Sequence, residues 1–314
     1  MKKTKVAFFG TSDRSLPILE SLNKHFELVL CVTKHDTKVG RKQEMKETAV
    51  KKWARDHVIR YVEIRSLKEY DLDLVLNELG KAKPAYGIVA DFSYIIPESI
   101  INFFGGRLIN IHFSLLPKYR GASPVQFAIL NGDETTGITF LLVSKRLDAG
   151  DILSQIGYKM NGTETSGELY ETLFSVAAEK LPEVIEGYKS GSIRPMPQDE
   201  NNATYTYSKT HPHHTFIFKE DGLINWKNDV KSIERKIRAF NPWPIAWTYL
   251  KDLQEASNLA HGKLNFRDSV DLELTVKIYS AHLEKDKLHI DKLQVEGRKI
   301  MTWEEFKNGY LEQT

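Results

Sequence analysis

Cysteine is almost absent from this chain of 314 residues, which contains only Cys31. A single cysteine excludes a disulfide within the chain, and its place in the apolar run Leu28-Val-Leu-Cys-Val32 predicts a buried thiol in a strand. Long apolar runs are missing too, since no stretch approaches the roughly 20 residues that cross a membrane. A short lysine-rich lead enters an apolar run at residues 6–9 without a secretory signal, so we expect a cytoplasmic protein.

An excess of charge of either sign is also lacking. The chain has 44 Lys and Arg against 42 Asp and Glu, a formal net charge of +2. An anionic partner must therefore be met by a local patch and not by the field of the whole protein. Hydrophobic residues make up 41% and charged residues 27% of the sequence, which is typical of a soluble globular protein of about two domains.

Apolar runs alternate with helical patterns in the N-terminal part of the chain. Strands are expected at residues 6–9, 28–33, 86–90, 107–111, 137–143 and 151–156, and helices at 17–23, 48–56 and 72–79. This alternation predicts an α/β fold with a Rossmann-like, mostly parallel sheet between helices. Thr165-Ser-Gly-Glu168 is typical of a capping box at the start of a further, long helix.

The composition changes at residues 191–214, which contain three prolines and no helical periodicity. We interpret this stretch as a linker between an N-terminal domain, 1–190, and a smaller C-terminal domain, 215–314. In the C-terminal domain we expect a helix over 230–237, stopped by Asn241-Pro-Trp-Pro244, and strands at 222–226, 272–280, 287–293 and 297–302.

The most informative stretch is Asn110-Ile-His112, which closes an apolar run. In a strand, residues two apart point to the same face, so the amide and the imidazole should converge where open α/β sheets bind their ligands. An amide can donate to a developing oxyanion, and an imidazole can exchange protons near neutral pH. Ser114-Leu-Leu-Pro117, Arg120-Gly-Ala-Ser-Pro124 and Leu147-Asp-Ala-Gly-Asp151 follow, with 35 residues between His112 and Asp148.

In this order and spacing, these motifs resemble the folate-dependent formyltransferases, and most closely the branch that formylates methionyl initiator tRNA. The resemblance implies transfer of a formyl group from the co-substrate 10-formyltetrahydrofolate to the α-amino group of methionine on the charged tRNA, for translation initiation. It implies no metal, a monomer, and a C-terminal OB-like β-barrel, which Arg238-Ala-Phe-Asn-Pro-Trp-Pro244 matches. The barrel is expected to be shortened.

Three residues are expected to be catalytic. Asn110 would stabilise the oxyanion, His112 would move a proton, and Asp148 would orient the imidazole and favour its protonated form. Each residue alone has a simpler interpretation, as a backbone-bonding amide, a structural histidine or a turn residue. Their combination in one motif favours catalysis. We leave Asp151 out of the catalytic set and assign His211-Pro-His-His214 no metal, because it lacks the spacing of a zinc site.

The resemblance also suggests binding residues. The folate pterin would contact Phe92, Ile95, Ile96, Pro97, Ser114, Leu115, Leu116 and Pro117, and the acceptor substrate would contact Gly10, Thr11, Lys38, Arg41 and Lys42. The first four could instead be a strand-to-helix turn packed on the core. The seven Lys and Arg of residues 34–52 could be a solvated face. A second basic set, at Lys227, Lys231, Arg235, Lys236 and Arg238, leaves tRNA contact and a solvated face equally open.

The sequence departs from the family pattern at two places beside the expected site. Arg14 replaces an aromatic or apolar residue, and Asp91-Phe-Ser93 replaces Ala-Tyr-Gly. Two other functions remain as alternatives. A nucleotide-sugar amine N-formyltransferase would share the motif but would not need the basic residues at 34–52. A non-catalytic RNA-binding relative would not need Asn110, His112 and Asp148.

Overall fold

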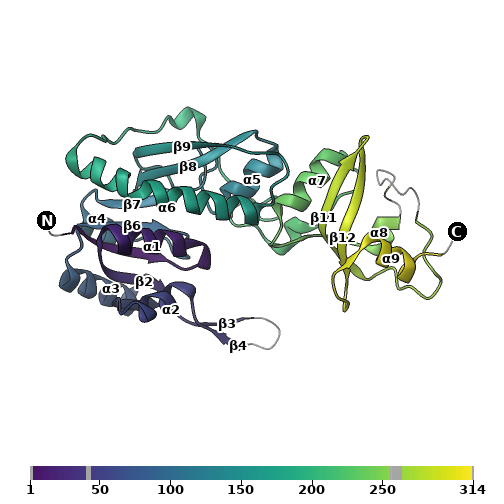
Figure 1. Ribbon diagram of the computed structural model, residues 1–314, viewed down its shortest axis with the longest axis horizontal. Helices are drawn as coiled ribbons and strands as arrows, with labels where there is room; N and C mark the ends of the chain where they lie inside the picture. The colour runs from purple at the N-terminus through teal and green to yellow at the C-terminus, as the bar shows by residue number, and fades with distance from the viewer. Residues whose placement is uncertain (1–2, 40–43, 255, 257–263, 313–314) are drawn as a thin grey trace. The chain divides into compact units, whose positions relative to one another are not determined.

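The computed structural model describes residues 3–39, 44–254, 256 and 264–312 (Figure 1). The chain forms two compact units. The first consists of Met1–Arg120, Gly137–Tyr158 and Tyr170–Thr204, and the second of Gly121–Thr136, Lys159–Leu169 and Tyr205–Thr314. Within the described ranges, no helix combines the length and apolarity that crossing a membrane requires.

A seven-stranded sheet dominates the first unit. Its strand order is β5-β2-β1-β6-β7-β8-β9, with β1 (Lys5–Gly10), β2 (Glu27–Lys34), β5 (Tyr61–Ile64), β6 (Tyr86–Ala90), β7 (Leu108–His112), β8 (Thr135–Leu142) and β9 (Ile152–Lys159). The first five strands in this order pair in parallel, whereas β8 pairs with β7 in antiparallel fashion. The predicted mostly parallel α/β sheet is therefore confirmed.

Helices cover this sheet: α1 (Leu16–His25), α2 (Ala49–Asp56), α3 (Glu69–Ala82), α4 (Glu98–Phe104) and the long α6 (Ser166–Ser190). A 3-10 turn, η1 (Asp13–Ser15), precedes α1. In Figure 1, α1 and α6 lie side by side, and the Ser21 hydroxyl donates to the Ala178 carbonyl at 2.5 Å. Cys31 is fully buried in β2, as predicted, and burial raises the pKa of its thiol.

The start of α6 confirms the expected capping box. The backbone N–H of Glu168 donates to Thr165 Oγ1 at 3.3 Å, and the N–H of Thr165 donates to Glu168 Oε2 at 2.9 Å. The hydrogen bonds that the Glu168 carboxylate accepts from the Thr165 N–H and the Thr165 hydroxyl lower its pKa. The helix is anchored further along by Phe174, whose ring centroid lies 4.1 Å from that of Phe113, the residue after β7. The sequence pattern did not predict β5 and α4, which are short.

The second unit contains α5 (Pro124–Asn131), η3 (Lys219–Gly222), α7 (Val230–Ala239), α8 (Leu250–Gln254), α9 (Trp303–Tyr310) and a small antiparallel sheet. The strand order of this sheet is β10-β11-β12-β13, with β10 (Ala246–Tyr249), β11 (Thr275–Glu284), β12 (Lys287–Val295) and β13 (Met301–Thr302). Its core includes Ile233 and Ile237 of α7, Val276 and Ile278 of β11 and Phe306 of α9. The separate small C-terminal sheet agrees with the predicted fold class.

Two expected strands of this unit are corrected. The strand expected at 222–226 is reduced to a single bridge between Leu223 and Trp247, because Asp221 accepts from the N–H of Phe218 and closes the turn η3. The strand expected at 297–302 is paired only over β13. An unexpected hairpin, β3 (Thr37–Val39) with β4 (Glu44–Lys46), lies in the basic stretch 34–52.

The stretch interpreted as a linker contains one short 3-10 turn, η2 (Glu200–Asn202). Its first part bonds to the first unit: Met196 and Ile152 exchange backbone hydrogen bonds, and the N–H of Thr204 donates to the Pro117 carbonyl at 3.2 Å. Residues 191–204 thus belong to the first unit and residues 205–214 to the second.

Candidate active site

Strand β7 ends on the pair that the sequence singled out. Asn110 and His112 lie two residues apart on this strand, and Asn110 pairs with Val89 of β6 on one side and with Leu141 of β8 on the other. The Asn110 side chain is half-buried and His112 is buried. Both therefore project from a central strand whose backbone is fixed on two sides.

Asp148 joins this pair from the segment between β8 and β9. The Asn110 amide nitrogen donates to Asp148 Oδ1 at 3.3 Å, and His112 Nδ1 lies 3.6 Å from Asp148 Oδ2. The φ of Asp148 is 47°, in the left-handed region that side-chain-bearing residues rarely adopt. The structure thus brings together the three residues expected to be catalytic, although 35 residues separate His112 from Asp148.

The second imidazole nitrogen also faces an oxygen. His112 Nε2 lies 2.9 Å from the backbone carbonyl of Tyr119. A neutral imidazole donates from only one nitrogen, whereas the protonated ring can donate both to this carbonyl and to the Asp148 carboxylate. Each nitrogen of the His112 ring thus faces an oxygen acceptor. Tyr119 could not be identified from sequence patterns, because it contributes a backbone atom.

The loop after β7 is held by a small polar network. Thr139 Oγ1 donates to the Ser114 carbonyl at 2.6 Å and accepts from the Leu116 N–H at 3.1 Å. The Ser114 hydroxyl donates to the Lys118 carbonyl at 2.6 Å, and the Leu116 side chain packs on Leu141 and Ile152. Ser114 and Leu116 therefore shape the loop from inside, whereas Leu115 and Pro117 are half-buried.

The loops after β1 and β6 lie against each other. The N–H of Thr11 donates to the Asp91 carbonyl at 3.1 Å, and the N–H of Ser93 donates to Thr11 Oγ1 at 3.2 Å. Gly10 pairs with Ala90 in the sheet, and a side chain at position 10 would lie 2.4 Å from the Phe8 ring. Gly10 and Thr11 thus occupy the carboxyl edge of the strand next to β6.

The four expected pterin residues have different surroundings. Phe92 and Ile96 pack on the core cluster beneath the sheet, and the Phe92 ring lies 5.8 Å from that of Phe9. Ile95 is 87% exposed, and Pro97 precedes α4 as its N-cap. Of these side chains, that of Ile95 is most open to a ligand in this conformation.

The basic stretch 34–52 is described only in part. Lys38 lies in β3, and Arg41 and Lys42 lie outside the described residues. One of the other cations has a structural role, since Lys51 Nζ lies 2.8 Å from Asp36 and 2.9 Å from Glu63. These bonds, that to Asp36 foremost, raise the pKa of Lys51.

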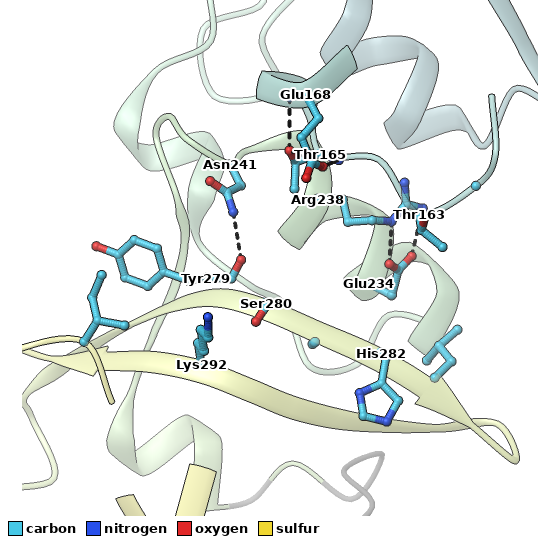
Figure 2. A pocket seen from close by; sticks show the side chains of 14 residues that line it. Thr163, Thr165, Glu168, Glu234, Arg238, Asn241, Tyr279, Ser280, His282 and Lys292 are labelled. Atoms are coloured by element: carbon cyan, nitrogen blue, oxygen red, sulfur yellow. Dashed lines mark hydrogen bonds and ion pairs between the residues drawn. The ribbon is translucent and has the colours of Figure 1, made fainter. Parts of the chain in front are cut away.

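The second unit contains a cavity of about 750 Å³ that is distinct from the cluster around Asn110 (Figure 2). Its walls include Thr165, Glu168 and Tyr279, and an internal ion pair joins Arg238 Nε to Glu234 at 2.5 Å. A second Arg238 nitrogen donates to the Glu164 carbonyl at 3.0 Å.

Another cation of the second basic set is also engaged. Lys236 Nζ donates to the Leu223 carbonyl, and burial lowers the pKa of this amine to about 8. Two of the five cations in this set, Lys236 and Arg238, therefore hold the second unit together.

Sequence reasoning missed one group with metal-ligand chemistry. The side chains of His282, Glu284 and His289 place potential ligand atoms within 4.8 Å of one another on β11 and β12. His282 also bonds Asp291 through Nδ1 at 2.8 Å. The alternation of His282 and Glu284 along one strand is the signal that could have indicated the group. It lies in the second unit, apart from Asn110, His112 and Asp148.

Comparison with known proteins agrees with this geometry. Residues 4–185 match the family described as formyl transferase, and residues 217–311 match the formyl transferase C-terminal domain. The methionyl-tRNA formyltransferase of Streptococcus mutans is 32% identical over 312 residues, covering 98% of this chain and 96% of the relative.

Two solved structures share the fold. Methionyl-tRNA formyltransferase from Clostridium thermocellum aligns with a TM-score of 0.56 and 17% identity, covering 93% of this chain and 98% of that one. HypX from Aquifex aeolicus in complex with tetrahydrofolic acid aligns with a TM-score of 0.61 and 15% identity, covering 98% of this chain and 47% of that one. Both domain matches and the full-length relative lead to one conclusion: the chain belongs to the methionyl-tRNA formyltransferase family.

Proposed function

We propose that this protein transfers the formyl group of 10-formyltetrahydrofolate to the α-amino group of methionyl initiator tRNA. The observation that carries the proposal is the cluster of Asn110, His112 and Asp148 on and beside β7, in a chain of this family. A structure with the same fold holds tetrahydrofolic acid, which supports folate as the formyl carrier.

The chemistry needs a donor for an oxyanion. The neutral amine of the aminoacyl group attacks the formyl carbon, and the carbonyl oxygen becomes negatively charged in the tetrahedral intermediate. The Asn110 amide has two N–H groups. One donates to Asp148, its only partner among the described residues, so the other can donate to the oxyanion.

His112 and Asp148 act on charge and protons. An imidazolium held between the Tyr119 carbonyl and the Asp148 carboxylate places positive charge beside the oxyanion. As the new C–N bond forms, the attacking nitrogen loses a proton. When the bond from the formyl carbon to the folate nitrogen breaks, that nitrogen gains a proton. Because an imidazolium has no free lone pair, the Asp148 carboxylate beside it is the group that can accept this proton and return it. Neither a metal ion nor a covalent nucleophile takes part in this scheme.

The binding assignments follow from the same proposal. The pterin would lie between the loop after β6, with Phe92, Ile95, Ile96 and Pro97, and the loop 114–117. The acceptor end of the tRNA would meet Gly10, Thr11 and the basic stretch with Lys38, Arg41 and Lys42. We propose residues 1–190 as the catalytic domain, 191–214 as a connection and 215–314 as a shortened barrel-like domain. A monomer in the cytoplasm fits this role.

The test is formyl transfer by the purified full chain. Radiolabelled 10-formyltetrahydrofolate is offered with charged initiator tRNA, uncharged tRNA or nucleotide-linked amino sugars. We expect formylmethionyl-tRNA from the charged tRNA only, formed at least about 100-fold more slowly by the variant Asp148→Asn. Product on amino sugars but not on tRNA would overturn the substrate assignment. If the folded protein binds both substrates without transferring the group, it is a non-catalytic relative.

A further inference from the structure

The side chain of Gln198 binds the backbone of the loop that carries Asp148. Gln198 Nε2 donates to the Asp148 carbonyl at 2.8 Å and to the Gly150 carbonyl at 2.8 Å. These two acceptors flank Ala149, so one side-chain amide binds the loop on both sides of its tip. Because the φ of Asp148 is 47°, its backbone adopts an unfavourable conformation that outside contacts must maintain.

A buried arginine fixes which end of the glutamine amide faces the loop. Arg120 is fully buried, and its Nε and Nη2 donate to Gln198 Oε1 at 3.1 and 2.8 Å. A guanidinium only donates, so the amide oxygen must face Arg120 and the amide nitrogen must face the Asp148 loop. The Glu200 carboxylate balances the buried charge by a two-pronged contact at 3.1 and 2.9 Å.

The same arginine is connected to the other side of the imidazole. Arg120 directly follows Tyr119, whose carbonyl faces His112 Nε2. The N–H groups of Tyr119 and Arg120 both donate to Thr204, at 2.9 Å to its hydroxyl and 2.8 Å to its carbonyl. The oxygen on Nε2 and the carboxylate on Nδ1 are thus anchored to one rigid network that includes residues 198–204.

We propose that Gln198 and Arg120 are positioning residues of the formyl transfer, which set the Asp148 carboxylate against Asn110 and His112. This inference rests on the proposed function. The two residues act through the Asp148 loop, so their removal should misplace the carboxylate without removing it. Misplacing a catalytic group by about 1 Å can cost about 100-fold in rate.

The decisive variant is Gln198→Glu, which keeps the shape and a partner for Arg120 but loses both donors to the loop. We expect kcat to fall by about 10- to 100-fold, with the KM for folate and for charged tRNA changed less than about threefold. The dependence of kcat on pH should also change, because Asp148 is the charged group paired with His112. Gln198→Asn, which keeps a shorter amide, should recover part of the rate.

A second mutation separates positioning from simple structural support. If Gln198 acts through Asp148, then adding Gln198→Glu to Asp148→Asn should lower the single-turnover rate by less than about twofold. Gln155→Glu is the matched control, because Gln155 Nε2 donates in the same way to the Leu116 carbonyl at 2.8 Å and to Thr139 at 2.9 Å. The fold-loss in single-turnover rate caused by Gln155→Glu should multiply fully with the fold-loss caused by Asp148→Asn when the two are combined.

A control variant outside the site, and the results that would contradict the proposal, complete the test. Ser21→Ala removes a hydrogen bond between α1 and α6 and should leave kcat and its pH dependence unchanged. The positioning role would be overturned if the fold-losses in rate caused by Gln198→Glu and by Asp148→Asn multiply fully in the double variant. It would also be overturned if Gln198→Glu leaves the pH dependence of kcat unchanged. Normal activity of Asp148→Asn would instead refute the catalytic assignment itself, so the two failures are distinguishable.

Discussion

The guanidinium of Arg14 lies 2.8 Å from Asp91 Oδ2 and joins the loop after β1 to the loop after β6. The hydroxyl of Ser12 donates to the same oxygen at 2.5 Å, and Arg14 lies 4.3 Å above the ring of Tyr170. Arg14 and Asp91 are both positions at which we expected the sequence to depart from the family pattern. In the structure, the cation at one position meets the anion at the other.

We predict that the ion pair of Arg14 with Asp91 contributes a small but measurable coupling energy to stability. The two side chains are 37% and 33% exposed, so solvent screens the interaction. A double-mutant cycle with Arg14→Leu and Asp91→Ala, measured by urea unfolding, should give a coupling energy of about 0.2–1 kcal/mol. A coupling energy of zero would show that the two substitutions are independent.

Removing any member of the catalytic cluster should abolish most of the turnover. Asn110→Ala and Asp148→Ala should each lower kcat by at least about 100-fold, because one removes the oxyanion donor and the other removes the partner of the imidazole. His112→Ala should be impaired to a similar degree. Circular dichroism is the control for folding. Near-normal turnover by a folded variant contradicts the role of that residue.

The basic stretch should contribute to tRNA binding alone. Arg41→Glu with Lys42→Glu should raise the KM for charged tRNA and flatten its dependence on salt, since fewer phosphate counterions are released. The KM for folate should stay the same. The control is Lys24→Glu with Lys68→Glu, which makes the same change in charge at two exposed lysines elsewhere. If both double variants change the KM for charged tRNA and its salt dependence equally, the basic stretch is only a solvated face.

Gly150 should tolerate no side chain. A Cβ at this position would lie 1.7 Å from the Leu142 carbonyl oxygen, so Gly150→Ala must displace the backbone beside Asp148. We expect a loss of roughly 1–3 kcal/mol in unfolding free energy, together with reduced kcat. Gly157→Ala is the control, because a Cβ there meets no atom within 4 Å, and it should change stability by less than about 0.5 kcal/mol. Equal stability of the two variants would contradict this account.

The pair of Glu200 with Arg120 should make the fold sensitive to acid. The hydrogen bond from Arg120, with a further bond from Arg146, lowers the pKa of Glu200 from 4.5 to about 2. A carboxyl whose pKa falls on folding stabilises the protein above its unfolded pKa and loses this effect as the pH drops toward the folded value. The wild type should therefore exceed Glu200→Gln in unfolding free energy at pH 7, and the difference should shrink between pH 4.5 and about 2. A difference that is independent of pH would contradict the shift.

Local patterns in the sequence determined much of the fold. Runs of apolar residues located β1, β2, β6 and β7, because a strand buried on both faces needs no polar positions. Thr165 and Glu168 located the start of α6, because a capping box uses only neighbouring residues. The expectation of a strand at 222–226 was wrong, because Asp221 accepts from the N–H groups of Phe218 and of the more distant Thr210, and these bonds form a turn that the apolar pattern alone does not show.

The candidate site also contains residues that the sequence predicts and residues that only the tertiary structure shows. The period of two along β7 determined that Asn110 and His112 share a face, which the sequence shows directly. The antiparallel pairing of β8 with β7, and the loop after it, decided that Asp148 meets them. Only the tertiary structure revealed Tyr119 and Gln198. The first acts through a backbone carbonyl, which carries no residue signal, and the second through hydrogen bonds to a loop 48 and 50 residues away in the chain.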